Sequence, residues 1–216
     1  MKKVLAIILF LFMSAGFLFA FTLSDSTVTV GIGFDTISGS GYSYDTGESF
    51  NSRILGGSAY LLYDVRLGQS NWFTRLGYEY ILLQSYSVFK DVPYSKESGY
   101  SKSASKNRGG VYYAYNASKV VGFCLGVSLT DITMKMTNNE TGIKLTNSFY
   151  AIGLIADCQF FFSEKLSARF SLNPDFIFLT TDKYHLVDGT YELTKSRSGF
   201  SAGYAVGAKV GLSYRF

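Results

Sequence analysis

The sequence predicts an all-β fold, a membrane-spanning antiparallel up-and-down barrel of about eight strands. Two observations lead to this prediction. Beyond residue 20 there is no apolar run long enough for a helix to cross a bilayer. Apolar residues instead alternate with small or polar ones over several long segments. Such alternation is typical of strands with lipid on one face and water on the other.

The composition agrees with this fold class. The chain has 216 residues, of which 47% are hydrophobic, 17% aromatic and only 17% charged, whereas soluble domains carry more charge. One all-β domain accounts for this length. The formal net charge of +4 is too small for a nucleic-acid-binding surface, so no nucleic acid partner is expected. The 2 cysteines lack the spacing of a metal site or redox motif, and no cofactor is expected.

The first 20 residues are expected to form a secretory signal peptide. Lys2 and Lys3 precede an apolar run over residues 4–13, and the small residues 14–16 follow it. Cleavage is expected after Gly16 or after Ala20, so that residues 21–216 form the barrel domain. A membrane anchor helix is the alternative, but the apolar stretch reaches about 20 residues only if the small residues count as membrane span.

Eight segments are expected to be strands. In the clearest one, every second residue from Phe200 to Phe216 is apolar or aromatic. The other segments lie near residues 27–37, 53–66, 72–83, 110–117, 120–136, 143–160 and 166–180, and segment 110–117 shows the shortest apolar stripe. Tight turns are expected near residues 67–71, 117–119 and 161–165. Loops are expected near residues 38–52, 85–109, 138–142 and 181–196.

Charged side chains of these strands fall on the face opposite to the apolar stripe, which would be the barrel lumen. This set has five acidic and five basic members: Asp35, Asp64, Arg66, Arg75, Glu79, Asp157, Arg169, Asp175, Lys209 and Arg215. Side chains can fill an eight-stranded barrel. Because an unpaired buried charge is costly, the set is expected to form a hydrogen-bonded plug. The alternative is a narrow path for small or hydrophobic solutes along Gly203, Gly207 and Gly211.

The chain ends in Val210-Gly211-Leu212-Ser213-Tyr214-Arg215-Phe216. With the strand pattern, this ending resembles the small eight-stranded outer-membrane barrels of the OmpA and OmpX type. The resemblance implies an outer-membrane location with bound membrane lipid. It also implies that the barrel-assembly machinery recognises the last strand, with Tyr214 and Phe216 as the assembly signal.

The segment 85–109 is the candidate surface for external binding. Its basic residues are Lys90, Lys96, Lys102, Lys106 and Arg108, interleaved with Tyr94 and Tyr100. Such a loop can bind anionic glycans or a partner protein through charge and amphipathic rings, and a solvated connector is the alternative.

The resemblance also raises the question of catalysis, because barrels of this kind include lipid A-modifying enzymes, which typically use a positioned histidine. The only histidine, His185, falls in an expected loop and lacks the deacylase pattern, so no catalytic residue is expected. The expected function is a non-enzymatic barrel that anchors surface loops for envelope integrity or adhesion. A narrow channel and a lipid A-modifying enzyme are the alternatives.

Overall fold

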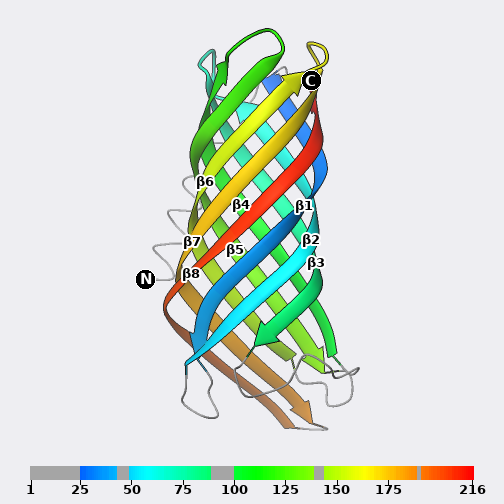
Figure 1. Cartoon of the computed structure of the whole chain (residues 1–216). Helices are drawn as coiled ribbons and strands as arrows, with labels where there is room; N and C mark the ends of the chain where they lie inside the picture. The colour runs from blue at the N-terminus through cyan, green and yellow to red at the C-terminus, as the bar shows by residue number, and fades with distance from the viewer. Residues whose placement is uncertain (1–24, 43–48, 89–99, 139–143, 189–190) are drawn as a thin grey trace.

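The computed structural model describes residues 25–42, 49–88, 100–138, 144–188 and 191–216 as a closed barrel (Figure 1). Its strands are β1 (Ser26–Tyr42), β2 (Ser49–Arg66), β3 (Trp72–Val88), β4 (Tyr100–Asn116), β5 (Val121–Asn138), β6 (Lys144–Phe161), β7 (Leu166–Asp188) and β8 (Tyr191–Arg215). Each strand pairs with the next, and β8 returns to β1. The predicted eight-stranded antiparallel barrel is confirmed. Within these described ranges, no helix is long and apolar enough to span a membrane.

Short turns join the strands at one end of the barrel, which we call the turn end. They connect β2 to β3, β4 to β5 and β6 to β7, and Phe216 lies at the same end. In the first turn, Leu67 N–H donates to the Trp72 carbonyl at 2.8 Å. Gly68 has a φ of 62°, a left-handed conformation that glycine adopts without steric cost. The opposite end, which we call the loop end, lies at the bottom of Figure 1.

The strands extend further toward the loop end than the sequence pattern predicts. β4 begins at Tyr100 and not near residue 110. β7 ends only at Asp188, and β8 already begins at Tyr191. The predicted loops 85–109 and 181–196 are therefore wrong over most of their length. An apolar stripe marks only the part of a strand that contacts lipid, whereas the hydrogen-bonded ladder continues beyond it.

The outer wall carries the apolar belt that the alternation predicts. Large hydrophobic side chains are exposed on every strand, among them Ile32, Leu61, Tyr78, Tyr115, Leu125, Ile152, Leu172 and Leu212. A continuous apolar surface of this extent is unfavourable in water and matches the lipid-facing band of a membrane barrel.

Two apolar clusters fill parts of the interior. The smaller one, close to the turn end, contains Phe73, Tyr112, Cys124 and Ile155. The larger one, which we call the apolar layer, lies toward the loop end and contains Ile37, Ile81, Ala104, Ile132, Met134, Phe149, Ala151, Ile177 and Ala205. Charged residues are also buried in the interior, and one of them, Arg75, lies against Tyr112 of the smaller cluster.

Candidate functional site in the barrel lumen

Among the residues whose burial the structure describes, ten charged side chains are buried in the lumen, five of them acidic and five basic. They are Asp35, Asp64, Arg75, Glu79, Lys106, Arg108, Asp157, Arg169, Asp175 and Lys209. Eight of them belong to the set that the sequence predicts. The prediction is wrong for Arg66 and Arg215, which both lie at the turn end. Arg66 is half-exposed there and Arg215 is exposed. Lys106 and Arg108 take their places, so the formal charges of the buried set sum to zero.

The ion pairs nearer the turn end join β2, β3, β6 and β7 across the lumen. Arg75 Nε lies 2.7 Å from Asp64 Oδ1, and Arg75 Nη2 lies 2.7 Å from Asp157 Oδ2. Arg169 Nη1 donates to the second Asp64 oxygen at 2.5 Å. The Arg75 guanidinium also lies 4.6 Å from the ring centroid of Tyr112. Asp64 therefore holds two guanidinium groups from different strands, an arrangement that offsets their desolvation.

A second group of ion pairs lies nearer the loop end. Lys106 Nζ lies 2.5 Å from Asp35 Oδ1, and Lys209 Nζ lies 2.6 Å from Glu79 Oε2. Lys209 also reaches Asp35 at 3.8 Å. The Ser58 hydroxyl donates to the other Asp35 oxygen at 2.8 Å. Residues from β1, β2, β3, β4 and β8 therefore meet in one hydrogen-bonded cluster.

Arg108 and Asp175 form a third buried pair, between β4 and β7. Arg108 Nη2 donates to Asp175 Oδ2 at 2.6 Å, and the Thr130 hydroxyl donates to Asp175 Oδ1 at 3.0 Å. Arg108 Nε in turn donates to the Thr130 hydroxyl at 3.2 Å. Every one of the ten buried charges has an oppositely charged partner within 4 Å.

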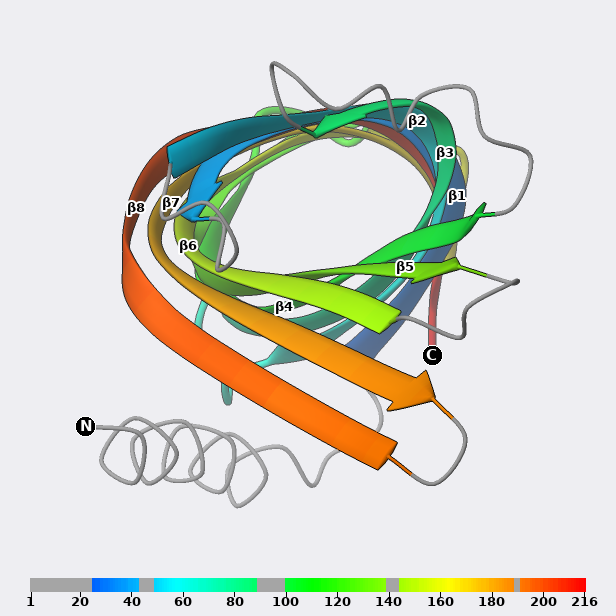
Figure 2. The same cartoon turned by 90° about the horizontal axis from the view of Figure 1, so that it is seen from below.

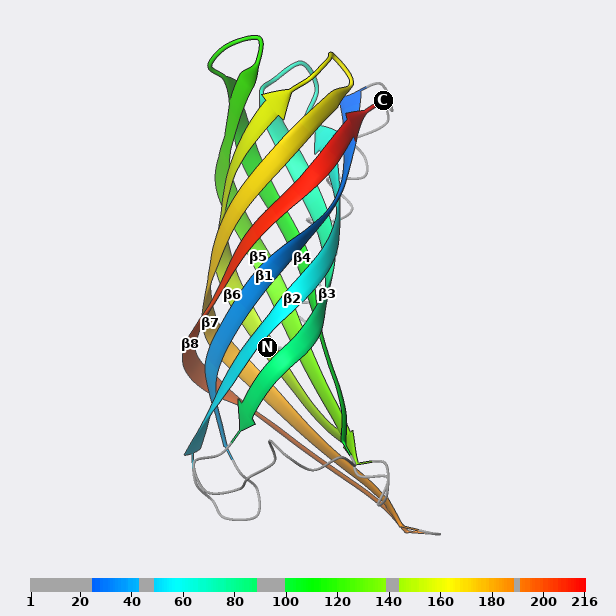
Figure 3. The same cartoon turned by 45° about the vertical axis from the view of Figure 1, so that its right-hand side comes forward.

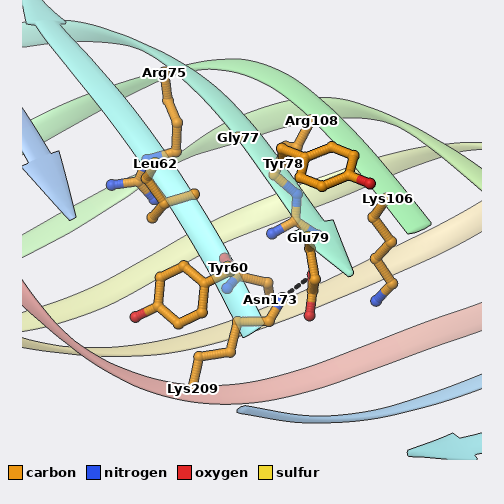
Figure 4. Close-up of a pocket in the computed structure, with 10 residues that line it drawn as sticks. All are labelled: Tyr60, Leu62, Arg75, Gly77, Tyr78, Glu79, Lys106, Arg108, Asn173 and Lys209. Carbon is orange, nitrogen blue, oxygen red and sulfur yellow. Dashed lines mark hydrogen bonds and ion pairs between the residues drawn. The ribbon is translucent and has the colours of Figure 1, made fainter. Parts of the chain in front are cut away.

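A small cavity lies between these groups in the lumen (Figure 4). Tyr60, Arg75, Lys106 and the Lys209–Glu79 pair contribute to its wall. The volume open to water is about 20 Å³, which is room for roughly one water molecule. A cavity of this size does not accommodate an organic solute.

Gly203, Gly207 and Gly211, which were the candidates for lining an open path, have other groups in the space beside them. A Cβ built on Gly207 would meet the Asp35 carboxylate, and one on Gly211 would meet the Tyr60 hydroxyl. A Cβ on Gly203 would meet the backbone of the neighbouring strand β1. These positions accept only glycine because neighbouring groups already fill the space.

The structure contradicts part of the prediction that the segment 85–109 is an external binding loop. Lys106 and Arg108 lie in β4 and point into the lumen, where both are buried. The sequence pattern predicts a loop at these positions because the lipid-facing stripe of this strand is short. Tyr100 and Lys102 also belong to β4, toward the loop end. Lys90, Tyr94 and Lys96 lie outside the described residues.

The ion pairs described above include neither His185 nor the two cysteines. His185 is part of β7, paired in register with Thr194 and Lys144, and not part of a loop. Cys124 is buried in the lumen and Cys158 is half-buried, and both thiols are free. In the described part of the chain, no group of three or more side chains is arranged to hold a metal ion.

The C-terminal residues close the barrel at the turn end. Phe216 N–H donates to the Ser26 carbonyl at 3.0 Å, which joins the end of β8 to the start of β1. The exposed rings of Tyr214 and Phe216 meet edge to face, with centroids 5.1 Å apart. Both rings are accessible from outside the barrel, as a recognition signal would require.

Deleting Phe216 should lower the amount of protein in the outer membrane, because the ring is the expected assembly signal. The amount of heat-modifiable barrel in isolated outer membranes measures this. Phe216→Tyr retains an aromatic ring and should insert like the wild type, whereas Phe216→Ala should resemble the deletion. Wild-type insertion of Phe216→Ala would exclude this residue as the signal.

Solved barrels of outer membranes share this fold. Neisserial surface protein A is 10% identical with a TM-score of 0.55, and the match covers 88% of this chain and 97% of that chain. A major outer membrane protein from Thermus thermophilus is 16% identical with a TM-score of 0.52, covering 86% and 99%. OprG from Pseudomonas aeruginosa is 11% identical with a TM-score of 0.50, covering 89% and 98%. No family model and no curated protein sequence matches the chain.

The fold and the apolar belt together place the chain in an outer membrane. In such barrels the short turns face the periplasm and the opposite end faces the exterior. The loop end of this barrel is therefore taken as its external end.

Proposed function

We propose that this protein is a non-enzymatic, non-conducting barrel that anchors external elements for adhesion or envelope integrity. The observation that supports this proposal is the filled lumen. A solute path would have to cross both the ion-paired region and the apolar layer, and the charged residues there are engaged with one another. The surface left for a partner is the external end.

The apolar layer extends across the lumen from wall to wall. Phe149 on β6 is fully buried, and a Cβ built on Gly39 of β1 would lie 2.9 Å from Phe149 Cε1. Because β6 and β1 are not neighbours in the barrel, the ring must reach across the interior. Apolar constrictions of this kind oppose ion passage because water and ions are unfavourable in them.

The other basic residues of the segment 85–109, Lys90, Lys96 and Lys102, are the candidates for binding an anionic surface. The triple variant Lys90→Ser, Lys96→Ser, Lys102→Ser should bind heparin-coated surfaces more weakly than the wild type. Its residual binding should depend less on salt, because screened charge attraction is the proposed cause. Lys106 and Arg108 are retained, because removing them would leave buried carboxylates unpaired.

A matched control removes positive charge at the opposite end. Lys119→Ser with Lys165→Ser changes two exposed residues of the periplasmic turns and should leave binding unchanged. Heat-modifiable migration checks folding of both variants. If the folded triple variant binds with unchanged affinity at low and high salt, these lysines are part of a solvated connector and not of an adhesive surface.

A further inference from the structure

Two of the eight strand pairings end before their strands do, and both end on the external side. The β1–β8 pairing stops at Gly39↔Gly203, although β8 begins at Tyr191. The β3–β4 pairing stops at Ile81↔Ala104, although β3 continues to Val88. Each of the other six pairings continues to the external end of at least one of its two strands. The barrel therefore divides there into a sheet of β1, β2 and β3 and a sheet of β4 to β8.

Strand β8 forms one edge of the second sheet. Among the described residues, positions 191–200 of β8 are paired with β7 and with no strand on the other side. We call these ten residues the β8 edge. β7 is itself paired with β6 as far as Lys144↔His185, so a multistranded sheet supports the edge. Figures 2 and 3 show the β7–β8 hairpin extending beyond the other strands.

We propose that the β8 edge binds an extended, acidic segment of an external protein by strand addition. In an antiparallel sheet, alternate residues direct their N–H and C=O groups to opposite sides, so about half of the edge residues present unpaired backbone groups. An added strand satisfies these groups in register. This inference rests on the proposed display function, and it names the surface and the kind of partner.

The charge of the edge favours an acidic partner over a second copy of this chain. The edge contains Lys195 and Arg197 but a single acidic residue, Glu192. An antiparallel pair of two β8 edges centred near these residues would place basic positions opposite one another, which is unfavourable. A segment with acidic residues at those positions would instead attract the edge. The edge also contains no proline, the residue that most directly prevents strand pairing.

Hydrogen exchange of the full chain in lipid nanodiscs tests the proposal. The probe is a synthetic peptide in which Glu alternates with Val and Thr. At saturation it should slow amide exchange in residues 191–200 by about tenfold or more, because paired amides exchange only on local opening. The same peptide with alternate backbone nitrogens methylated cannot form the ladder and should have no effect. In the variant Lys195→Glu, Arg197→Glu, a Lys-containing peptide should replace the acidic one as the better ligand.

Three outcomes would overturn the inference. In the first, no peptide slows exchange at the β8 edge. In the second, the methylated peptide slows exchange as much as the unmethylated one. In the third, the edge is protected without peptide and the protection rises with protein concentration. The last outcome would show that a second copy covers the edge. These results are independent of whether the barrel conducts ions. A barrel that conducts no ions and binds no peptide would contradict this inference but would agree with the proposed closed lumen.

Discussion

Replacing Asp64 with Asn should lower the free energy of unfolding by about 3–5 kcal/mol, the usual cost of breaking a buried ion pair on one side. Asp64 is fully buried and accepts hydrogen bonds from both Arg75 and Arg169. The neutral amide leaves two buried guanidinium groups with Asp157 as their remaining carboxylate. The expected loss is large because the two positive charges then lie close together in a region that excludes water.

Urea unfolding in lipid vesicles measures this loss, and the fluorescence of Trp72, the only tryptophan, reports it. The control is Asp25→Asn, which removes the partner of Arg66 in an ion pair 3.7 Å long at the turn end. That pair is solvent-accessible, so its loss should cost less than about 1 kcal/mol. Equal and small losses in the two variants would show that the lumen pairs do not hold the barrel together.

Replacing Phe149 with Ala should also destabilise the barrel by about 3–5 kcal/mol, as expected for a fully buried phenylalanine. The ring contributes to the apolar layer and packs against Gly39 on the opposite wall. Alanine would leave a cavity that the rigid strands cannot close, because their ladder fixes the diameter of the barrel.

The same unfolding assay compares Phe149→Ala with Phe149→Leu, which retains most of the apolar volume. The leucine variant should lose much less stability, since a smaller cavity costs less. A second control is Phe162→Ala, because this side chain is exposed in a periplasmic turn. Loss of stability in Phe162→Ala as large as in Phe149→Ala would mean that the apolar layer is not a packed core.

The alternation of residues was sufficient to predict the fold. From Val121 to Leu129 in β5 and from Phe200 to Tyr214 in β8, the outward positions are apolar without interruption. The structure exposes outward side chains of both strands as predicted, for example Leu125 and Leu212. The number of strands and their pairing order follow, because each apolar stripe is one crossing of the membrane. The external ends of strands were not predictable in this way, since no lipid contacts them there.

The alternation of residues also could not predict which charged residues are buried in the lumen. Lys106 and Arg108 occupy alternate positions within a polar, lysine-rich segment, so nothing local distinguishes a buried strand from a loop. Their partners are distant: Asp35 lies 71 positions from Lys106, and Asp175 lies 67 positions from Arg108. Arg66 and Arg215 have the inward parity but lie at the turn end, where solvent reaches them. Parity thus predicts the face of a strand, and the depth of a residue along the barrel decides whether it is buried.

The current through single barrels in planar lipid bilayers measures whether the lumen is closed. Insertion is verified by heat-modifiable migration of the same preparation. The ion-paired cluster and the apolar layer predict no steady current above that of the protein-free bilayer over the physiological range of voltage and salt. A reproducible, steady single-channel conductance that appears with each inserted barrel would contradict the closed lumen.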